Sequence, residues 1–315
     1  MKSSMLLAFF HRGRTIWLSA FFAIFALSPT LAVAAGKANN PLATSFLTEL
    51  KSIEHGTADL TDRLPSDVRA DRIDLLSKLM YTQEALDLIS EREKLGDDAY
   101  FLFDRARALM LGSRCPEMLT MLNEPVSALK KMFQEAASGA MSWKIGRDPI
   151  LQLPVYCLTA LGEYDEALAM IPYVMRGITQ FGGGTEEHWY WISWIKALHL
   201  LGVKPTKSVE NFLFAFEKEK SRNSYDWIVL QVTEGKIDFE TARRNLDAFK
   251  FSATQMQLEL AKLLFFSGVR EFATTGHTDK FCQLDALAPY GDPKWMASKR
   301  FDRKTAPCAI TPNVK

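Results

Sequence analysis

The sequence lacks both an excess of one charge and the short motifs of common enzymes. It has 38 lysines and arginines against 37 aspartates and glutamates, and loss of a leader containing Lys2, Arg12 and Arg14 would leave 35 against 37. This balance argues against nucleic acid as the main partner. The chain has no HExxH helix, GxSxG turn, P-loop or dinucleotide fingerprint. The sequence therefore predicts no catalytic residue, no cofactor and no metal site.

Long apolar runs are absent too, apart from one near the N-terminus. Positive charges precede an apolar stretch from Ile16 to Leu27, and small residues follow it. This pattern predicts a signal peptide over residues 1–35, cleaved after Ala34 or Ala35, because about 12 apolar residues fall short of the roughly 20 that a spanning helix needs. An uncleaved amphipathic anchor is the alternative. We expect a mature chain without a membrane span, in the periplasm of a bacterium with two membranes or secreted.

Cysteine is scarce, and the four cysteines all follow the predicted leader. An even number in an oxidising compartment predicts two disulfides. Proximity along the chain favours the pairs Cys115–Cys157 and Cys282–Cys308, and free buried thiols are the alternative. No two cysteines have CxxC spacing, which argues against a dithiol redox role or a zinc site.

The two-residue alternation of β-strands is missing as well. From residue 65 onward, apolar residues recur with helical spacing almost without interruption, so the predicted fold class is all-α. We expect a linker and a short helix over residues 36–64 and a helical domain over 65–277. The remainder, 278–315, is richer in proline and basic residues. It is predicted to be an irregular tail, stapled by the second disulfide, that caps the last helix.

One local pattern recurs along the helical domain. A glycine that ends one apolar helix and precedes the next is expected at Gly112, Gly162, Gly202, Gly235 and Gly268. These glycines lie 50, 40, 33 and 33 residues apart. A small residue one turn into the following helix should allow close helix packing, at Ala85, Ala167, Ser208, Ala242 and Ala273. Recurrence near 33 residues indicates stacked helix pairs.

The segment GEYDEAL is the clearest copy of this pattern. With Gly162, Tyr164 and Ala167 in this order, it resembles the tetratricopeptide repeat, a helix pair of about 34 residues. The resemblance covers about residues 68–277 and is degenerate, since Leu151 stands where the family has tryptophan. It implies a right-handed α-solenoid of antiparallel helix pairs whose concave face binds a peptide or a partner helix, and it implies no chemistry. A generic solenoid or an irregular helical bundle is the alternative.

Two groups of side chains are candidate contact sites. Aromatic rings are concentrated at Trp189, Tyr190, Trp191 and Trp194. They project from more than one helical face, so they either pack in the core or contact a partner. Basic side chains gather in the tail at Lys294, Lys299, Arg300, Arg303 and Lys304. They form either a patch for an anionic partner or a solvated cap.

These patterns favour an exported, non-enzymatic scaffold or adaptor, and the sharper form of this hypothesis is an assembly or regulatory factor for an envelope complex. One alternative is a periplasmic inhibitor or immunity-type protein that blocks a single enzyme or toxin. Another is a hydrolase of envelope polymers, which requires a carboxylate pair that the sequence does not reveal. In each of the first two cases the partners are envelope or periplasmic proteins.

Overall fold

The computed structural model describes residues 40–56, 65–94, 101–135, 149–180, 185–216 and 224–301. Within these ranges the chain forms α-helices and no β-strand, which confirms the all-α prediction there. The predicted signal peptide and three tail residues, Arg303, Lys304 and Cys308, lie outside the described residues. None of the described helices combines the length and apolar character that a membrane span requires.

Fourteen α-helices are present in the described ranges. In chain order they are α2 (Pro41–Glu54), α3 (Pro65–Lys78), α4 (Thr82–Lys94), α5 (Phe101–Leu111), α6 (Cys115–Glu135), α7 (Gln152–Leu161), α8 (Tyr164–Gln180), α9 (Thr185–Leu200), α10 (Lys207–Phe216), α11 (Tyr225–Glu234), α12 (Phe239–Leu246), α13 (Ala253–Thr275), α14 (Asp279–Leu287) and α15 (Pro293–Ser298). A 3-10 turn, Pro149–Leu151, precedes α7.

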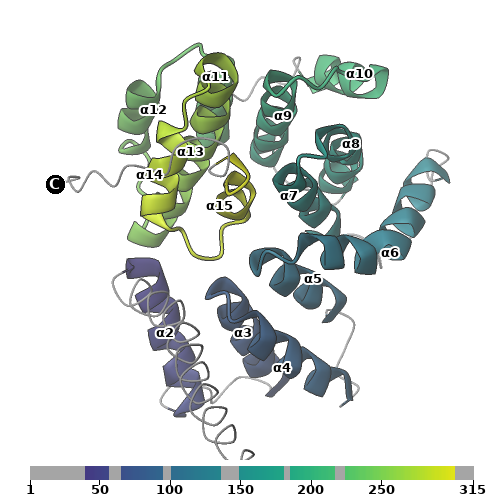
Figure 1. The fold of residues 1–315 in the computed structure, drawn as a ribbon, viewed down its shortest axis with the longest axis vertical. Helices are drawn as coiled ribbons and strands as arrows, with labels where there is room; N and C mark the ends of the chain where they lie inside the picture. Colours follow the sequence, from purple (N-terminus) through teal and green to yellow (C-terminus); the bar gives the residue numbers. More distant parts are fainter. Residues whose placement is uncertain are drawn as a thin grey trace, which may run out of the picture.

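The helices follow one another around an open ring (Figure 1). The chain runs from α2 through α3 and α4 to α5 and α6, passes α7 to α10, and returns through α11 to α14. Helix α15 lies inside the ring, where it contacts α7, α13, α5 and α14. Elements far apart in the sequence are thus brought together around the last helix.

The predicted glycine turns are partly confirmed. Gly162 and Gly235 end α7 and α11 with left-handed φ angles of 81° and 73°, and Gly202 follows α9 with a φ angle of 98°. Gly112 was expected to do the same and does not, because Ser113 takes the left-handed angle, φ 60°. A side chain at Gly112 would instead collide with Thr82, since its Cβ would lie 2.1 Å from the hydroxyl oxygen. Gly112 therefore permits a close approach between helices.

Gly268 is a second correction, because it ends no helix. It lies inside α13, a helix of 23 residues, and a Cβ there would lie 2.7 Å from the ring of Phe281. The glycine thus lets α14 pack closely on α13. Ala273, predicted to be a buried packing residue, is exposed on the same helix, whereas Ala85, Ala167 and Ala242 are fully buried as expected.

The prediction of an irregular tail from residue 278 is wrong for residues 279–298. Helices α14 and α15 form there, and Phe281 and Ala297 are fully buried. The start of α15 has a clear sequence signal, since Asp292 accepts hydrogen bonds from the backbone N–H groups of Lys294 and Trp295, and proline follows it at the first helical position. The prediction missed this short helix because it took the high proline content of the segment as a sign of irregular structure.

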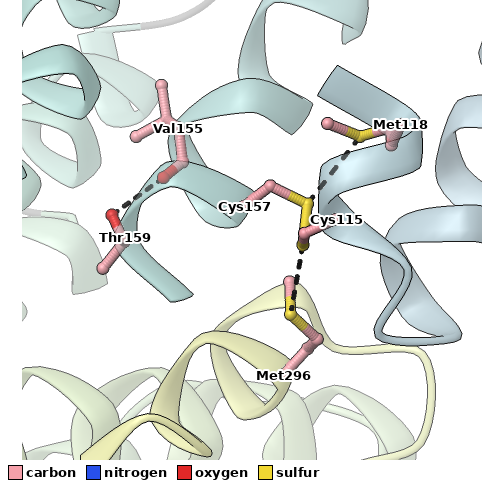
Figure 2. Close-up of a disulfide and its surroundings, with 6 residues drawn as sticks. All are labelled: Cys115, Met118, Val155, Cys157, Thr159 and Met296. Atoms are coloured by element: carbon pink, nitrogen blue, oxygen red, sulfur yellow. Dashed lines mark hydrogen bonds between the residues drawn. A yellow bond between two sulfur atoms is a disulfide. The ribbon is translucent and has the colours of Figure 1, made fainter. Parts of the chain in front are cut away.

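The predicted disulfide between Cys115 and Cys157 is present, with Cα atoms 5.2 Å apart. It joins the start of α6 to α7. Figure 2 shows two methionine sulfurs against it, with Met296 of α15 at 3.9 Å from Cys115 Sγ and Met118 at 3.9 Å from Cys157 Sγ. Cys282 is also disulfide-bonded, but the other half of the predicted second pair lies beyond the described ranges.

Buried apolar side chains form two clusters. The main core contains residues from Ala106 to Phe301, and a smaller N-terminal core contains residues from Ala43 to Ala108 together with Tyr290. Helix α5 contributes to both cores, and Trp295 packs against both. We call the boundary between α2–α4 and the helices that carry the main core the seam.

Candidate functional site at the ring interior

Three of the four aromatic residues of α9 are buried. Trp189, Trp191 and Trp194 are 6%, 1% and 0% exposed, and Tyr190 is half-buried. Trp189 packs edge-on against Trp227 of α11, while Trp194 meets Phe265 of α13. Helix α9 has α8, α11 and α13 around it, so both of its aromatic faces are covered. The predicted partner contact is wrong for Trp189, Trp191 and Trp194, because burial leaves these three rings no access to a partner, and it stays a prediction for the half-buried Tyr190.

The three described residues of the predicted basic patch form ion pairs or hydrogen bonds within the chain. Lys294 is 8% exposed and pairs with Asp292 at 2.9 Å. Lys299 pairs with Asp285. Arg300 donates a hydrogen bond at 3.2 Å to the hydroxyl of Tyr164 and another to the carbonyl oxygen of Leu161. For Lys294 the interpretation as part of a surface patch is wrong, because this side chain is buried, whereas for the half-buried Lys299 and Arg300 it stays a prediction.

Arg300 and Arg270 fill similar positions at two helix ends. Each guanidinium lies where the Cβ of a helix-ending glycine would be, Arg300 at Gly162 and Arg270 at Gly235. Each also donates to a carbonyl at the end of that helix, Arg270 to the carbonyl of Thr233 at 3.3 Å. A cation at a helix C-terminus is favourable because the last carbonyls lack intrahelical donors.

The aromatic and basic groups predicted as separate sites meet in the ring interior. The hydroxyls of Tyr156 and Tyr190 lie 3.2 Å apart, and Lys294 Nζ lies 5.7 Å from the centre of the Tyr190 ring. On the other side, Lys262 Nζ lies 5.5 Å from the same ring and pairs with Asp226 at 2.7 Å. The sequence contained these residues but no signal of their proximity, since α7, α9, α13 and α15 are far apart along the chain.

The environment keeps this cluster in one protonation state near neutral pH. Burial raises the pKa of Tyr156 and of Tyr190 well above the usual range. Burial alone would lower the pKa of Lys294, but the adjacent Asp292 carboxylate acts together with Tyr156 and Glu259 in the opposite direction, and the pKa is raised. The tyrosines therefore stay neutral and the lysine stays charged. Such a cluster suits specific packing of α15 and supplies no group that exchanges protons at neutral pH.

Two clefts lie along the seam. The larger, about 580 Å³, separates the start of α2 from α13 and α14 and is lined by Asn40, Pro41, Ala253, Met256, Gln257, Leu260 and residues 286–288. The smaller, about 40 Å³, is lined by Met80, Leu111, Ser113, Gly291, Asp292, Trp295, Met296 and Lys299. Met80 is the one large apolar side chain classed as exposed among the described residues, at 37%. Sequence patterns missed this surface because it exists only where distant helices meet.

A third cleft, of about 360 Å³, lies between the turn joining α11 to α12 and helix α13. Lys280 and Arg270 line it, and both are already engaged, Lys280 over the ring of Phe239 at 3.9 Å and Arg270 at the end of α11. Within the described ranges, no group of three or more histidine, cysteine, aspartate or glutamate side chains is placed to hold a metal ion.

Comparisons with known proteins found no matching family profile and no significant match among curated proteins or solved structures. The resemblance to tetratricopeptide repeats therefore stays a prediction.

Proposed function

We propose that this chain is an exported, non-enzymatic scaffold or adaptor that binds other proteins of the cell envelope. The observation that carries the proposal is the open ring of packed helix pairs (Figure 1). Such an arrangement presents many helix faces to solvent for the amount of core that it buries, which suits protein contact.

The contact surface in this proposal differs from the one that the sequence pattern favoured. Helix α15 occupies the ring interior, and the three tryptophans of α9 are buried. We therefore assign the partner contact to exposed helix faces. Two of these faces carry opposite charge. The face of α4 is negative, with Glu84, Asp87 and Glu91, and the face of α12 is positive, with Arg243 and Arg244.

Export is part of the proposal. The N-terminal pattern of charge, apolar run and small residues supports it. The bond between Cys115 and Cys157 supports it as well, because disulfides persist in oxidising compartments and are rare in the cytosol. N-terminal sequencing of the mature protein should begin at residue 35 or 36.

Affinity capture of the full exported chain from envelope extract tests this function. A scaffold should retain several proteins in fixed ratio, whereas an inhibitor should retain a single enzyme. Two matched variants reverse the charge of one face each, E84K, D87K, E91K on α4 and R243E, R244E on α12. Binding of a specific partner should be lost in one variant and kept in the other. Turnover of cell-wall glycan by the purified chain, abolished by one carboxylate substitution, would contradict a scaffold.

A further inference from the structure

The N-terminal helices α2–α4 form a body with its own core. Their buried side chains, among them Ile73, Leu79 and Ile89, belong to the N-terminal core and not to the main core. On one side this body rests on α5, through the ion pairs Arg92–Asp104 at 3.2 Å and Arg105–Glu93 at 2.8 Å. Helix α5 is therefore the continuous connection between the two cores.

On the other side the body meets the rest of the ring through few residues. Asn40 Nδ2 donates to the carbonyls of Leu287 and Ala288, at 3.2 and 3.0 Å. Tyr290 enters the N-terminal core and packs edge-on against Trp295, with ring centres 5.3 Å apart. We call Asn40, Tyr290 and Trp295 the clasp. Both seam clefts lie beside the clasp.

Backbone conformation marks the same boundary. The described residues other than glycine with left-handed φ angles are Met80 at 61°, Ser113 at 60° and Ala288 at 41°. Met80 and Ser113 line the smaller seam cleft, and Ala288 lines the larger one. Each of the three follows the end of a helix, α3, α5 or α14, where a left-handed residue closes the last turn, so three helices end at the seam.

We propose that the clasp is a reversible closure, and that α2–α4 swing on α5 as one body when it opens. Opening breaks the two Asn40 hydrogen bonds, parts Tyr290 from its apolar neighbours and joins the seam clefts into a single groove. Apart from Tyr290, which leaves the N-terminal core, the packing within each core is kept. The motion belongs to the chain itself and does not depend on the proposed function, so a failed capture experiment leaves it standing.

The sharpest variant of the clasp is Asn40→Asp. The Asn40 side-chain oxygen accepts from the backbone N–H of Ala43 at 3.0 Å and caps α2, and an aspartate keeps that bond. It loses both donations to the carbonyls of residues 287 and 288. Because each such bond contributes a factor of about two to twelve to an equilibrium, the open share should rise about tenfold or more.

Gln257→Glu is the matched control. Gln257 Nε2 donates to the same carbonyl, that of Leu287, at 3.1 Å, but it lies on α13, on the same side of the seam as α14. The substitution removes the same kind of bond and adds the same charge without touching the clasp. It should leave the seam closed.

Pulsed electron spin resonance on the full oxidised chain measures the opening. Spin labels carried by an unnatural amino acid are placed at the exposed positions Glu49 and Thr254, on opposite sides of the seam. A reference pair at Ala169 and Thr254 lies entirely on the side of the main core. In Asn40→Asp, we expect the fraction of molecules with a long Glu49–Thr254 distance to be about ten times that of wild type. The Gln257→Glu variant should have the wild-type distances, and the reference pair should be unchanged in both variants. Unchanged distances in Asn40→Asp, or equal broadening of the reference pair, would overturn the closure.

Discussion

At the residue scale, the buried pair of Lys294 and Asp292 is the most consequential feature of the ring interior. Both side chains are almost fully buried, and the carboxylate also caps α15. An unpaired charge in such a place costs far more than the pair itself contributes, because nothing else compensates its lost hydration.

Lys294→Met should therefore lower the free energy of unfolding by about 3 kcal/mol or more, since it leaves the Asp292 carboxylate buried without its cation. The double variant Lys294→Met, Asp292→Asn should recover much of the loss, because asparagine still caps α15 and carries no charge. Urea unfolding followed by circular dichroism measures both. Equal losses in the single and double variants would contradict this role.

The same pair predicts a pH dependence. The pKa of Lys294 is raised in the folded state, so the stability that it contributes is complete below the unfolded pKa and is lost as pH rises through the higher folded value. The stability difference between wild type and Lys294→Met should thus be constant up to about pH 9 and shrink at more alkaline pH. Unfolding midpoints across this range provide the measurement, and a difference that grew with pH would refute the assignment.

Gly162 and Gly276 offer a matched pair of substitutions. Both have left-handed φ angles, 81° and 74°, but a Cβ at Gly162 would meet the Arg300 guanidinium at 2.0 Å, whereas Gly276 has open space. Gly276→Ala should cost about 1 kcal/mol from backbone strain alone. Gly162→Ala should cost clearly more in a thermal or urea melt, because Arg300 must also leave the end of α7. Similar losses would show that the arginine contact contributes nothing.

At the element scale, the structure shows that α15 packs against the disulfide between α6 and α7. Met296 of α15 lies against the sulfur of Cys115 (Figure 2), and Phe301 stacks on Phe281 of α14 at 4.5 Å. The bond between α6 and α7 thus forms part of the surface on which the last helix packs. Sequence periodicity predicted α6 and α7, but it could not predict that α15 covers them.

Replacing Cys115 and Cys157 together by serine should lower the free energy of unfolding by about 3–4 kcal/mol, since the bond closes a loop over a sequence separation of 42 residues. The variant should also loosen α15, which hydrogen exchange of its amides would detect. Wild-type exchange in α15 would show that the helix packs independently of the bond.

At the scale of the whole molecule, two cores imply two levels of stability. Leu79 belongs to the N-terminal core and Leu263 to the main core, and both are fully buried. Each truncation to alanine should cost about 2–5 kcal/mol. Leu79→Ala should accelerate amide exchange chiefly in α2–α4, while Leu263→Ala should accelerate it throughout. Uniform acceleration in Leu79→Ala would indicate a single cooperative unit.

The sequence by itself determined the local features of this protein. Helical periodicity predicted the all-α class, three of the five glycines were correctly predicted to follow a helix with a positive φ angle, and proximity identified the bond between Cys115 and Cys157. Each depends on residues close together in the chain, where spacing and backbone preference are sufficient.

Only the tertiary structure decided where the candidate sites lie. Arg300 meets Tyr164 across 136 residues, and Asn40 meets Ala288 across 248. Periodicity shows that a helix has an apolar face, but not which distant helix will cover it. For that reason the three tryptophans of α9 and Lys294 of α15 were candidates for a surface site in the sequence, whereas packing buries all four side chains.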